Sequence, residues 1–136
     1  MSSSLSWAIA GDVLIAFNRP HPIPDDVFEL FIKTIPTYQY AKLLATSTGP
    51  ANISSTQRKH FSEIFRSAKV ATVSDHRLTR GVITAMGWLG LDIKAFGWDR
   101  LRDAVEYLDP RGVTPAELNG VTLKLREKSM RLDSVA

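Results

Sequence analysis

The sequence predicts a mixed, largely parallel α/β domain with an N-terminal antiparallel hairpin, crossover helices and an additional C-terminal helix. Two short apolar runs near the N-terminus flank a Gly-Asp pair, which is typical of a tight turn between two strands. Short apolar runs then alternate with stretches of helical periodicity as far as residue 108. Such alternation requires crossover connections, which join parallel strands within one sheet.

The hairpin and the first helix are predicted within residues 5–36. The hairpin strands are 5–10, "LSWAIA", and 13–17, "VLIAF", and the second run is apolar throughout, as expected of a strand covered on both faces. After the proline-rich "RPHPIP", Asp25 and Asp26 favour a helix start, and Pro36 ends that helix.

Strands and helices alternate through the rest of the sheet-forming region. The strand segments are short and bounded by turn residues, whereas the helical segments place apolar residues three and four positions apart. The predicted strands are 41–46, 69–74 and 91–96, and the predicted helices begin at Ser54 and span 77–90 and 98–108.

The C-terminal segment "VTPAELNGVTLKLREKSM" is predicted to be a further helix. Thr114 and Glu117 have the spacing of a capping box, and Pro115 stands in the first turn, where a helix tolerates proline best. The apolar residues form a narrow stripe that can dock on its own domain, on a second copy or on another protein. We therefore expect a domain at 1–110 and a helical extension at 111–136. The candidate docking residues of this helix are Leu118, Val121 and Leu125, with Leu132 farther along the stripe.

Composition excludes several classes of function. The 17 basic and 14 acidic side chains leave a net charge of only +3 over 136 residues, which is a weak signal for nucleic-acid binding. The absence of cysteine excludes disulfides and thiolate metal sites and agrees with a reducing compartment. The longest apolar runs are far shorter than the roughly 20 residues that span a bilayer. We expect a cytoplasmic protein that binds no nucleic acid and does not span a membrane.

The sequence contains no catalytic motif of the common kinds. It has no glycine-rich phosphate loop and no Gly-x-Ser-x-Gly nucleophile elbow, and its histidines are not spaced as metal ligands. His60 is expected on the solvent side of its helix. Asp75, His76 and Arg77 follow a predicted strand at the position where α/β sheets bind ligands, although Asp75 is also an ordinary helix cap. We expect no enzyme activity, no metal and no cofactor.

Three stretches of the chain resemble a known family. They are "KLLATSTGPANISSTQRKHFSEIF" (42–65), "AKVATVSDHRLTRGVITAMGWLG" (68–90) and "LDIKAFGWDRLRDAVEYL" (91–108). They resemble the STAS domain of bacterial anti-sigma-factor antagonists, and especially the STAS-like branch related to CRAL-TRIO lipid-binding domains. The resemblance covers about residues 5–109 and leaves the C-terminal helix unexplained.

The resemblance implies a regulatory serine at the start of the first crossover helix. The family carries an Asp-Ser-Ser-Gly motif there, and the matching residues are Ile53, Ser54, Ser55 and Thr56, so both serines match and the flanking Asp and Gly do not. Ser54 and Gln57 also have the spacing of a capping box, which by itself accounts for Ser54. The candidate phosphorylation or docking residues are Ser47, Ser54, Ser55, Thr56 and Arg58.

The resemblance implies a non-enzymatic regulatory or scaffold module in the bacterial cytoplasm. It would bind a protein partner through residues 47–62, and the C-terminal helix would provide a second contact or a homodimer face. The alternative is a small-molecule or lipid-binding domain of the CRAL-TRIO type. That alternative requires an apolar cavity lined by phenylalanines, namely Phe28, Phe31, Phe61 and Phe65.

Overall fold

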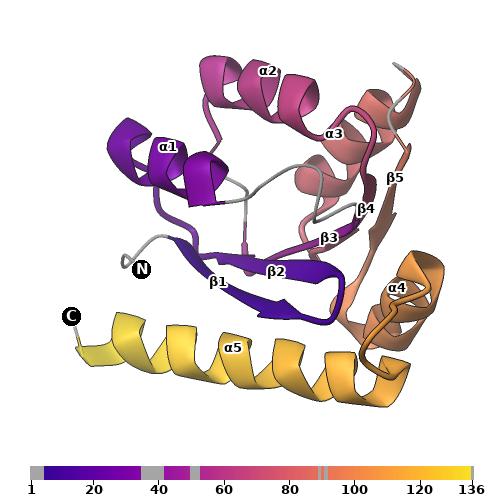
Figure 1. Cartoon of the computed structure of the whole chain (residues 1–136). Coiled ribbons are helices and arrows are strands. Elements are labelled where there is room, and N and C mark those ends of the chain that lie inside the picture. The colour runs from indigo at the N-terminus through magenta and orange to yellow at the C-terminus, as the bar shows by residue number, and fades with distance from the viewer. Residues whose placement is uncertain (1–4, 35–41, 50–52, 89, 91, 136) are drawn as a thin grey trace.

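A computed structural model describes residues 5–34, 42–49, 53–88, 90 and 92–135 (Figure 1). These residues form a five-stranded mixed sheet in the strand order β1-β2-β3-β4-β5. The strands are β1 (Leu5–Ala10), β2 (Val13–Asn18), β3 (Lys42–Ser47), β4 (Lys69–Val73) and β5 (Asp92–Phe96). Since β1 and β2 are antiparallel and all later pairs are parallel, the predicted α/β class with an N-terminal hairpin is confirmed.

Helices cover both faces of the sheet. They are α1 (Asp25–Thr34), α2 (Ser55–Ile64), α3 (Arg77–Trp88), α4 (Leu101–Leu108) and α5 (Pro115–Val135), with a 3₁₀ turn at Trp98–Arg100. Figure 1 shows α1 and α2 on one side of the sheet and α4 and α5 on the other, with α3 packed beside β5. The crossover helices make β2 to β5 run in the same direction, so their carboxyl ends lie together at one end of the sheet. The candidate site lies at that end.

The last helix of the alternating region differs from its prediction. Residues 98–108 do not form one helix, because the 3₁₀ turn comes first and α4 begins only at Leu101. Asp109 ends α4 in a left-handed conformation with a φ of 47°. Pro36, which was expected to end the first helix, lies outside the described residues.

The core consists of two apolar layers, one on each face of the sheet. Every residue of β2 is buried, as the unbroken apolar run predicted. The layer under α4 and α5 includes Val13, Ile15, Phe17, Leu44, Val73, Leu101, Val105, Leu108, Leu118 and Leu125. The layer under α1 and α2 includes Leu5, Leu14, Ile23, Phe28, Phe31, Leu43, Phe65 and Val70.

Helix α5 docks on its own domain, which decides among the three alternatives for its stripe. Leu118 is fully buried, Leu125 is 9% exposed, and Val121 packs against the same core layer as β2 and β3. Leu118 and Leu125 are therefore buried within the domain and are not exposed to a partner, whereas Val121 is partly buried. Leu132 is not among the side chains that the structure describes.

Polar contacts hold α5 along its length. The Thr114 hydroxyl accepts from the Glu117 N–H at 3.1 Å and Glu117 accepts from the Thr114 N–H at 3.2 Å, which confirms the predicted capping box. Farther along, the guanidinium of Arg126 lies 4.3 Å from the ring centroid of Trp98. Near the C-terminus, the buried Arg19 donates from Nη1 to the Ser129 carbonyl at 2.6 Å. Helix α5 is thus packed against the sheet and α4.

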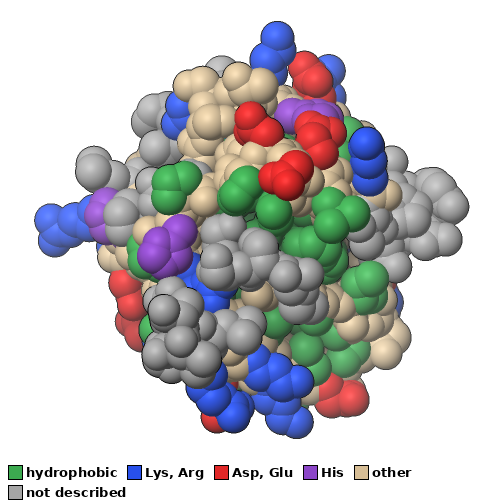
Figure 2. All heavy atoms as spheres, turned by 90° about the vertical axis from the view of Figure 1, so that its left-hand side faces the viewer, with side chains coloured by type: hydrophobic (Ala, Val, Ile, Leu, Met, Phe, Trp, Pro, Cys, Tyr) green, Lys and Arg blue, Asp and Glu red, His purple; other side chains and the backbone are tan. Residues whose placement is uncertain are grey.

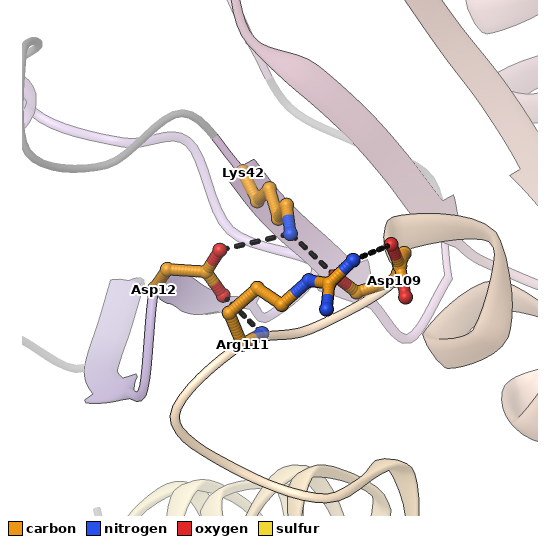
Figure 3. Close-up of polar contacts among 4 residues, drawn as sticks. All are labelled: Asp12, Lys42, Asp109 and Arg111. Atoms are coloured by element: carbon orange, nitrogen blue, oxygen red, sulfur yellow. Dashed lines mark hydrogen bonds and ion pairs between the residues drawn. The ribbon is translucent and has the colours of Figure 1, made fainter.

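A cluster of charged residues joins three distant segments at the amino ends of the parallel strands (Figure 3). Lys42, at the start of β3, lies 2.8 Å from the Asp12 carboxylate in the hairpin turn and also donates to the Asp109 carbonyl. The other Asp12 oxygen accepts from the Arg111 N–H at 2.8 Å, while the Asp12 N–H donates to the Arg111 carbonyl at 3.0 Å. Arg111 Nη2 donates to Asp109 at 3.0 Å. The four residues Asp12, Lys42, Asp109 and Arg111 are called the hairpin clamp below.

The hairpin clamp changes the titration of Asp12. Partial burial acts to raise the pKa of this carboxyl, but the hydrogen bonds from Lys42 and from the Arg111 N–H, together with the Lys42 charge, outweigh it. The pKa of Asp12 is consequently below its ordinary value of 3.8. The ionised carboxylate is therefore part of the folded structure.

Glycine is required where the hairpin turn meets the α4–α5 connection. Gly11 has a φ of +58°, and a Cβ built on it would lie 2.2 Å from the Arg111 carbonyl oxygen. Gly112 packs against Gly11 from the other side with a φ of +76°. Two backbones approach each other here more closely than any side chain would allow.

None of the helices in the described part of the chain is long and apolar enough to cross a membrane.

We expect Gly11→Ala to lower the free energy of unfolding by at least about 1–2 kcal/mol, from the left-handed backbone alone. The clash with the Arg111 carbonyl adds to this loss. Urea denaturation measures the change. Gly81→Ala is the matched control, because Gly81 lies in α3 with open space around it and should be neutral or stabilising. Equal stability of the two variants would contradict the close approach.

We expect Asp12→Asn to lower the free energy of unfolding at neutral pH by roughly 1 kcal/mol, because it removes the charge that pairs with Lys42. A lowered pKa means that the carboxylate contributes stability above the ordinary value of 3.8 and loses it as pH falls through the folded-state pKa. The gap between wild type and variant should therefore close in acid. Urea denaturation at a series of pH values checks this, and a gap that stays constant throughout the acid range would contradict it.

Candidate functional site

The candidate site lies at the start of α2, at the carboxyl ends of the parallel strands. Strand β3 ends at Ser47, and α2 begins at Ser55 after a loop of which residues 50–52 lie outside the described residues. This end of an open α/β sheet is where such folds most often bind their ligands. The side chains exposed at the helix start, Ser54, Ser55, Thr56 and Arg58, are called the α2 N-terminal surface below.

Ser54 caps α2 in the way that its sequence predicted. Its backbone is extended, with φ −67° and ψ 163°, and its hydroxyl accepts from the Gln57 N–H at 3.1 Å. The Gln57 side chain accepts in return from the Ser54 N–H at 3.2 Å. The predicted capping box is confirmed, and it fixes the direction in which the chain enters the helix.

Gln57 also fixes the helix start to the rest of the molecule, which the sequence did not reveal. The side chain is 4% exposed, and its Nε2 donates to the Ile23 carbonyl at 2.8 Å and to Asp25 Oδ1 at 3.0 Å. One amide therefore serves the cap of α2 and the start of α1 together. The i+3 spacing from Ser54 predicted the first role, but the second joins residues more than thirty positions apart.

Ser55 is exposed and takes no part in the capping box. Both Ser55 and Arg58 are exposed, and Arg58 Nη2 donates to Ser55 Oγ at 3.1 Å. The first turn of α2 has no acidic residue, so the positive end of the helix dipole is not compensated by side chains of that turn. An anion attached at Ser55 would lie at the helix N-terminus and within reach of one guanidinium.

Ser47 does not belong to this surface, contrary to the prediction. It is the last residue of β3 and only 6% exposed, and its carbonyl accepts from Trp98 Nε1 at 2.8 Å. The sequence suggested otherwise because Ser47 is followed directly by polar loop residues. Only the pairing of β3 in the interior of the sheet shows that this serine is covered.

His60 was expected on the solvent side of α2, and its side chain is 34% exposed but also contacts α1. Its Nδ1 lies 3.1 Å from Glu29 Oε1 on α1, and its ring packs 6.2 Å from that of Phe28. His60 therefore connects α2 to α1 on the flank of the candidate site. Figure 2, which views the molecule from the left of Figure 1, shows acidic side chains gathered at the top of this face.

The phenylalanines of the ligand-binding alternative pack against one another. Phe28, Phe31 and Phe65 are each at most 4% exposed, and Phe61 packs against their layer. The ring centroids of Phe61 and Phe65 are 4.6 Å apart, and those of Phe28 and Phe31 are 6.5 Å apart. These distances are those of rings in contact, so the four rings contribute to the core.

The residues at the end of β4 are held in structural contacts. Asp75 Oδ1 accepts from the Trp98 N–H at 2.9 Å, so this carboxylate fixes the loop after β5, which the sequence did not reveal. The His76 N–H donates to Ser74 Oγ at 3.1 Å, while His76 Nδ1 is buried without a hydrogen-bond partner among the described residues. The part of the chain that the structure describes contains no hydrogen bond between the Asp75 and His76 side chains.

Within the described ranges, no group of three or more His, Asp or Glu side chains could hold a metal ion. An open hollow of about 420 Å³ lies between α4 and the start of α5, lined by Arg102, Glu106, Thr114, Pro115, Ala116 and Asn119. It is formed by other elements than those of the α2 N-terminal surface.

No protein-family model, no curated protein and no solved structure matches this chain. The geometry of the site therefore carries the functional argument.

We expect Ser54→Ala to lower the free energy of unfolding by about 1 kcal/mol, because it removes the acceptor for the Gln57 N–H. Thermal or urea denaturation measures the loss. Ser62→Ala is the matched control on the same helix, since the Ser62 hydroxyl donates to the Arg58 carbonyl within the helix and is not at its N-terminus. If both serines could be replaced at the same cost, the capping role would be disproved.

Proposed function

We propose that this chain is a non-enzymatic, STAS-like regulatory module of the bacterial cytoplasm. It binds another protein through the loop and first crossover helix at residues 47–62, with the α2 N-terminal surface at the centre of the contact. The resemblance of residues 42–65 to the corresponding STAS segment motivates this assignment. The α/β class, with a hairpin followed by parallel strands, is compatible with it.

The proposal rests mainly on one observation. The α2 N-terminal surface exposes polar side chains, while a buried side chain beneath it holds the start of the helix in place. Ser54, Ser55 and Thr56 are exposed, while the buried Gln57 beneath them ties the helix start to α1. A surface that is held in place loses less conformational entropy when a partner binds it. Fixed, exposed polar groups therefore favour a binding role for this end of the sheet.

Ser55 is the better position for a regulatory phosphate. The Ser54 hydroxyl is engaged with the Gln57 N–H, whereas the hydrogen bond found for Ser55 Oγ among the described residues comes from the exposed Arg58 guanidinium. A phosphate at Ser55 adds about two negative charges at the positive end of the helix, where they do not disturb folding. The added charge would instead change which partners the surface accepts. The absence of the family's Asp and Gly at Ile53 and Thr56 means that a modifying enzyme would meet different neighbours here.

The test compares wild type with Ser55→Glu in affinity capture from the native cytoplasm, followed by titration calorimetry with the purified partner. We expect Ser55→Glu to change the partner's Kd by about tenfold or more, which corresponds to about 1.4 kcal/mol. Ser67→Glu is the matched control, because Ser67 is exposed beyond the end of α2 and receives the same change of charge. The control should keep the wild-type affinity.

Two results would refute the proposal. Partners captured equally by all three proteins with equal affinity would place the contact away from the α2 N-terminal surface. Failure of wild type and both variants to retain any protein would remove the case for a protein-binding module.

A further inference from the structure

Helix α5 contains an Asn-Gly pair in its second turn, where Asn119 precedes Gly120. Glycine inside a helix is less favourable than alanine, because its backbone loses more conformational freedom on folding. A Cβ built on Gly120 would meet no atom within 4 Å, so the packing of α5 does not require glycine here. Gly120 does, however, affect the reactivity of the residue before it.

An asparagine followed by glycine is prone to intramolecular deamidation. The main-chain nitrogen of Gly120 attacks Cγ of Asn119 and forms a C–N bond, and the side-chain amide leaves as ammonia with the proton that this nitrogen loses. Water then opens the cyclic succinimide at either of its two carbonyl carbons, which gives aspartate or isoaspartate. Glycine favours the first step because it has no Cβ to obstruct the attack and its backbone is flexible. The reaction needs no enzyme and no co-reactant except water.

The helical conformation keeps this pair from reacting. In an α-helix each N–H donates to the carbonyl four residues earlier, and the helical ψ directs the next nitrogen away from the side chain. The start of α5 is held by the capping box at Thr114, whose carbonyl also accepts from the Leu118 N–H at 2.9 Å. Leu118 and Thr122, on either side of the pair, are 0% and 1% exposed. The docked helix therefore holds the pair in the unreactive conformation.

Burial does not protect Asn119 from water. This residue is partly exposed and lines the open hollow between α4 and the start of α5, together with Arg102 and Glu106. The water that the second step consumes is therefore within reach. Helix ends are among the parts of a protein that open locally most readily. A local opening of the start of α5 would release the pair from its helical conformation while the rest of the domain stays folded.

We propose that Asn119 is a site of spontaneous deamidation and that the docked start of α5 controls its rate. An isoaspartate at this position adds one carbon atom to the main chain between the buried residues Leu118 and Thr122. The helix then cannot keep its hydrogen-bonding register on both sides of the modified residue, so the docking of α5 weakens irreversibly. The site is separate from the α2 N-terminal surface and extends beyond the function proposed above.

The test follows deamidation of the full chain in mildly alkaline buffer by peptide mass spectrometry, which detects the replacement of an amide by a carboxyl group. In urea, Asn119 should react much faster than Asn18 and Asn52, because larger residues follow those two asparagines. In native buffer, the reaction at Asn119 should be far slower than in urea. Gly120→Ala should abolish the fast reaction in urea, and it should keep the fold because the added methyl group meets no neighbour.

Thr114→Ala tests the control by α5. It removes the acceptor for the Glu117 N–H and should speed the native reaction at Asn119 about fivefold, the ratio that corresponds to about 1 kcal/mol of capping. Ser54→Ala is the matched control, because it removes an equivalent cap from α2 on the other side of the sheet. This control should leave the native rate at Asn119 unchanged. Circular dichroism establishes that both variants are folded.

Three outcomes would overturn the proposal. Equal rates at the three asparagines in urea would mean that Gly120 confers no special reactivity. A native rate at Asn119 equal to the rate in urea would mean that the helix gives no protection. Equal native rates in Thr114→Ala and Ser54→Ala, whether raised or unchanged, would mean that the start of α5 does not control the reaction.

Discussion

The contact between the hairpin turn and the α4–α5 connection is the constraint on which much of the rest depends. Asp12 there binds Lys42 of β3 and the backbone of Arg111, and the glycines Gly11 and Gly112 let the two chain segments touch. This contact fixes where α5 begins and therefore which face of the sheet it covers. Without α5, the apolar layer beneath Leu118 and Leu125 would be open to water. The hairpin clamp is small, but it determines how the far end of the chain completes the core.

Because α5 packs on its own domain, Leu118 and Leu125 of its apolar stripe are buried and are not part of the protein surface. Its stripe resembled a docking helix because it is narrow, with charged residues on both sides. The helix instead closes the second face of the sheet and is held by Arg126 against Trp98 and by the Arg19–Ser129 contact. The α2 N-terminal surface lies on the other side of the sheet from α5 (Figure 1).

The α2 N-terminal surface has the chemistry on which the proposed function depends. It is polar, lies at the positive end of a helix dipole and carries Arg58, so we expect charge to dominate any recognition there. A change of charge at Ser55 would act on this surface without disturbing the buried Gln57 contacts that hold the helix start in place.

Local patterns in the sequence determined the α/β class, the order of elements and the two capping boxes. These features depend on residues close together in the chain, as the Ser54–Gln57 and Thr114–Glu117 pairs illustrate. Tertiary structure alone decided that Gln57 also binds Ile23, that Ser47 is buried, that His60 faces Glu29 and that α5 covers its own sheet. Each of these depends on segments that only folding brings together. Spacing along the chain reports the face on which a side chain lies, but not what covers that face.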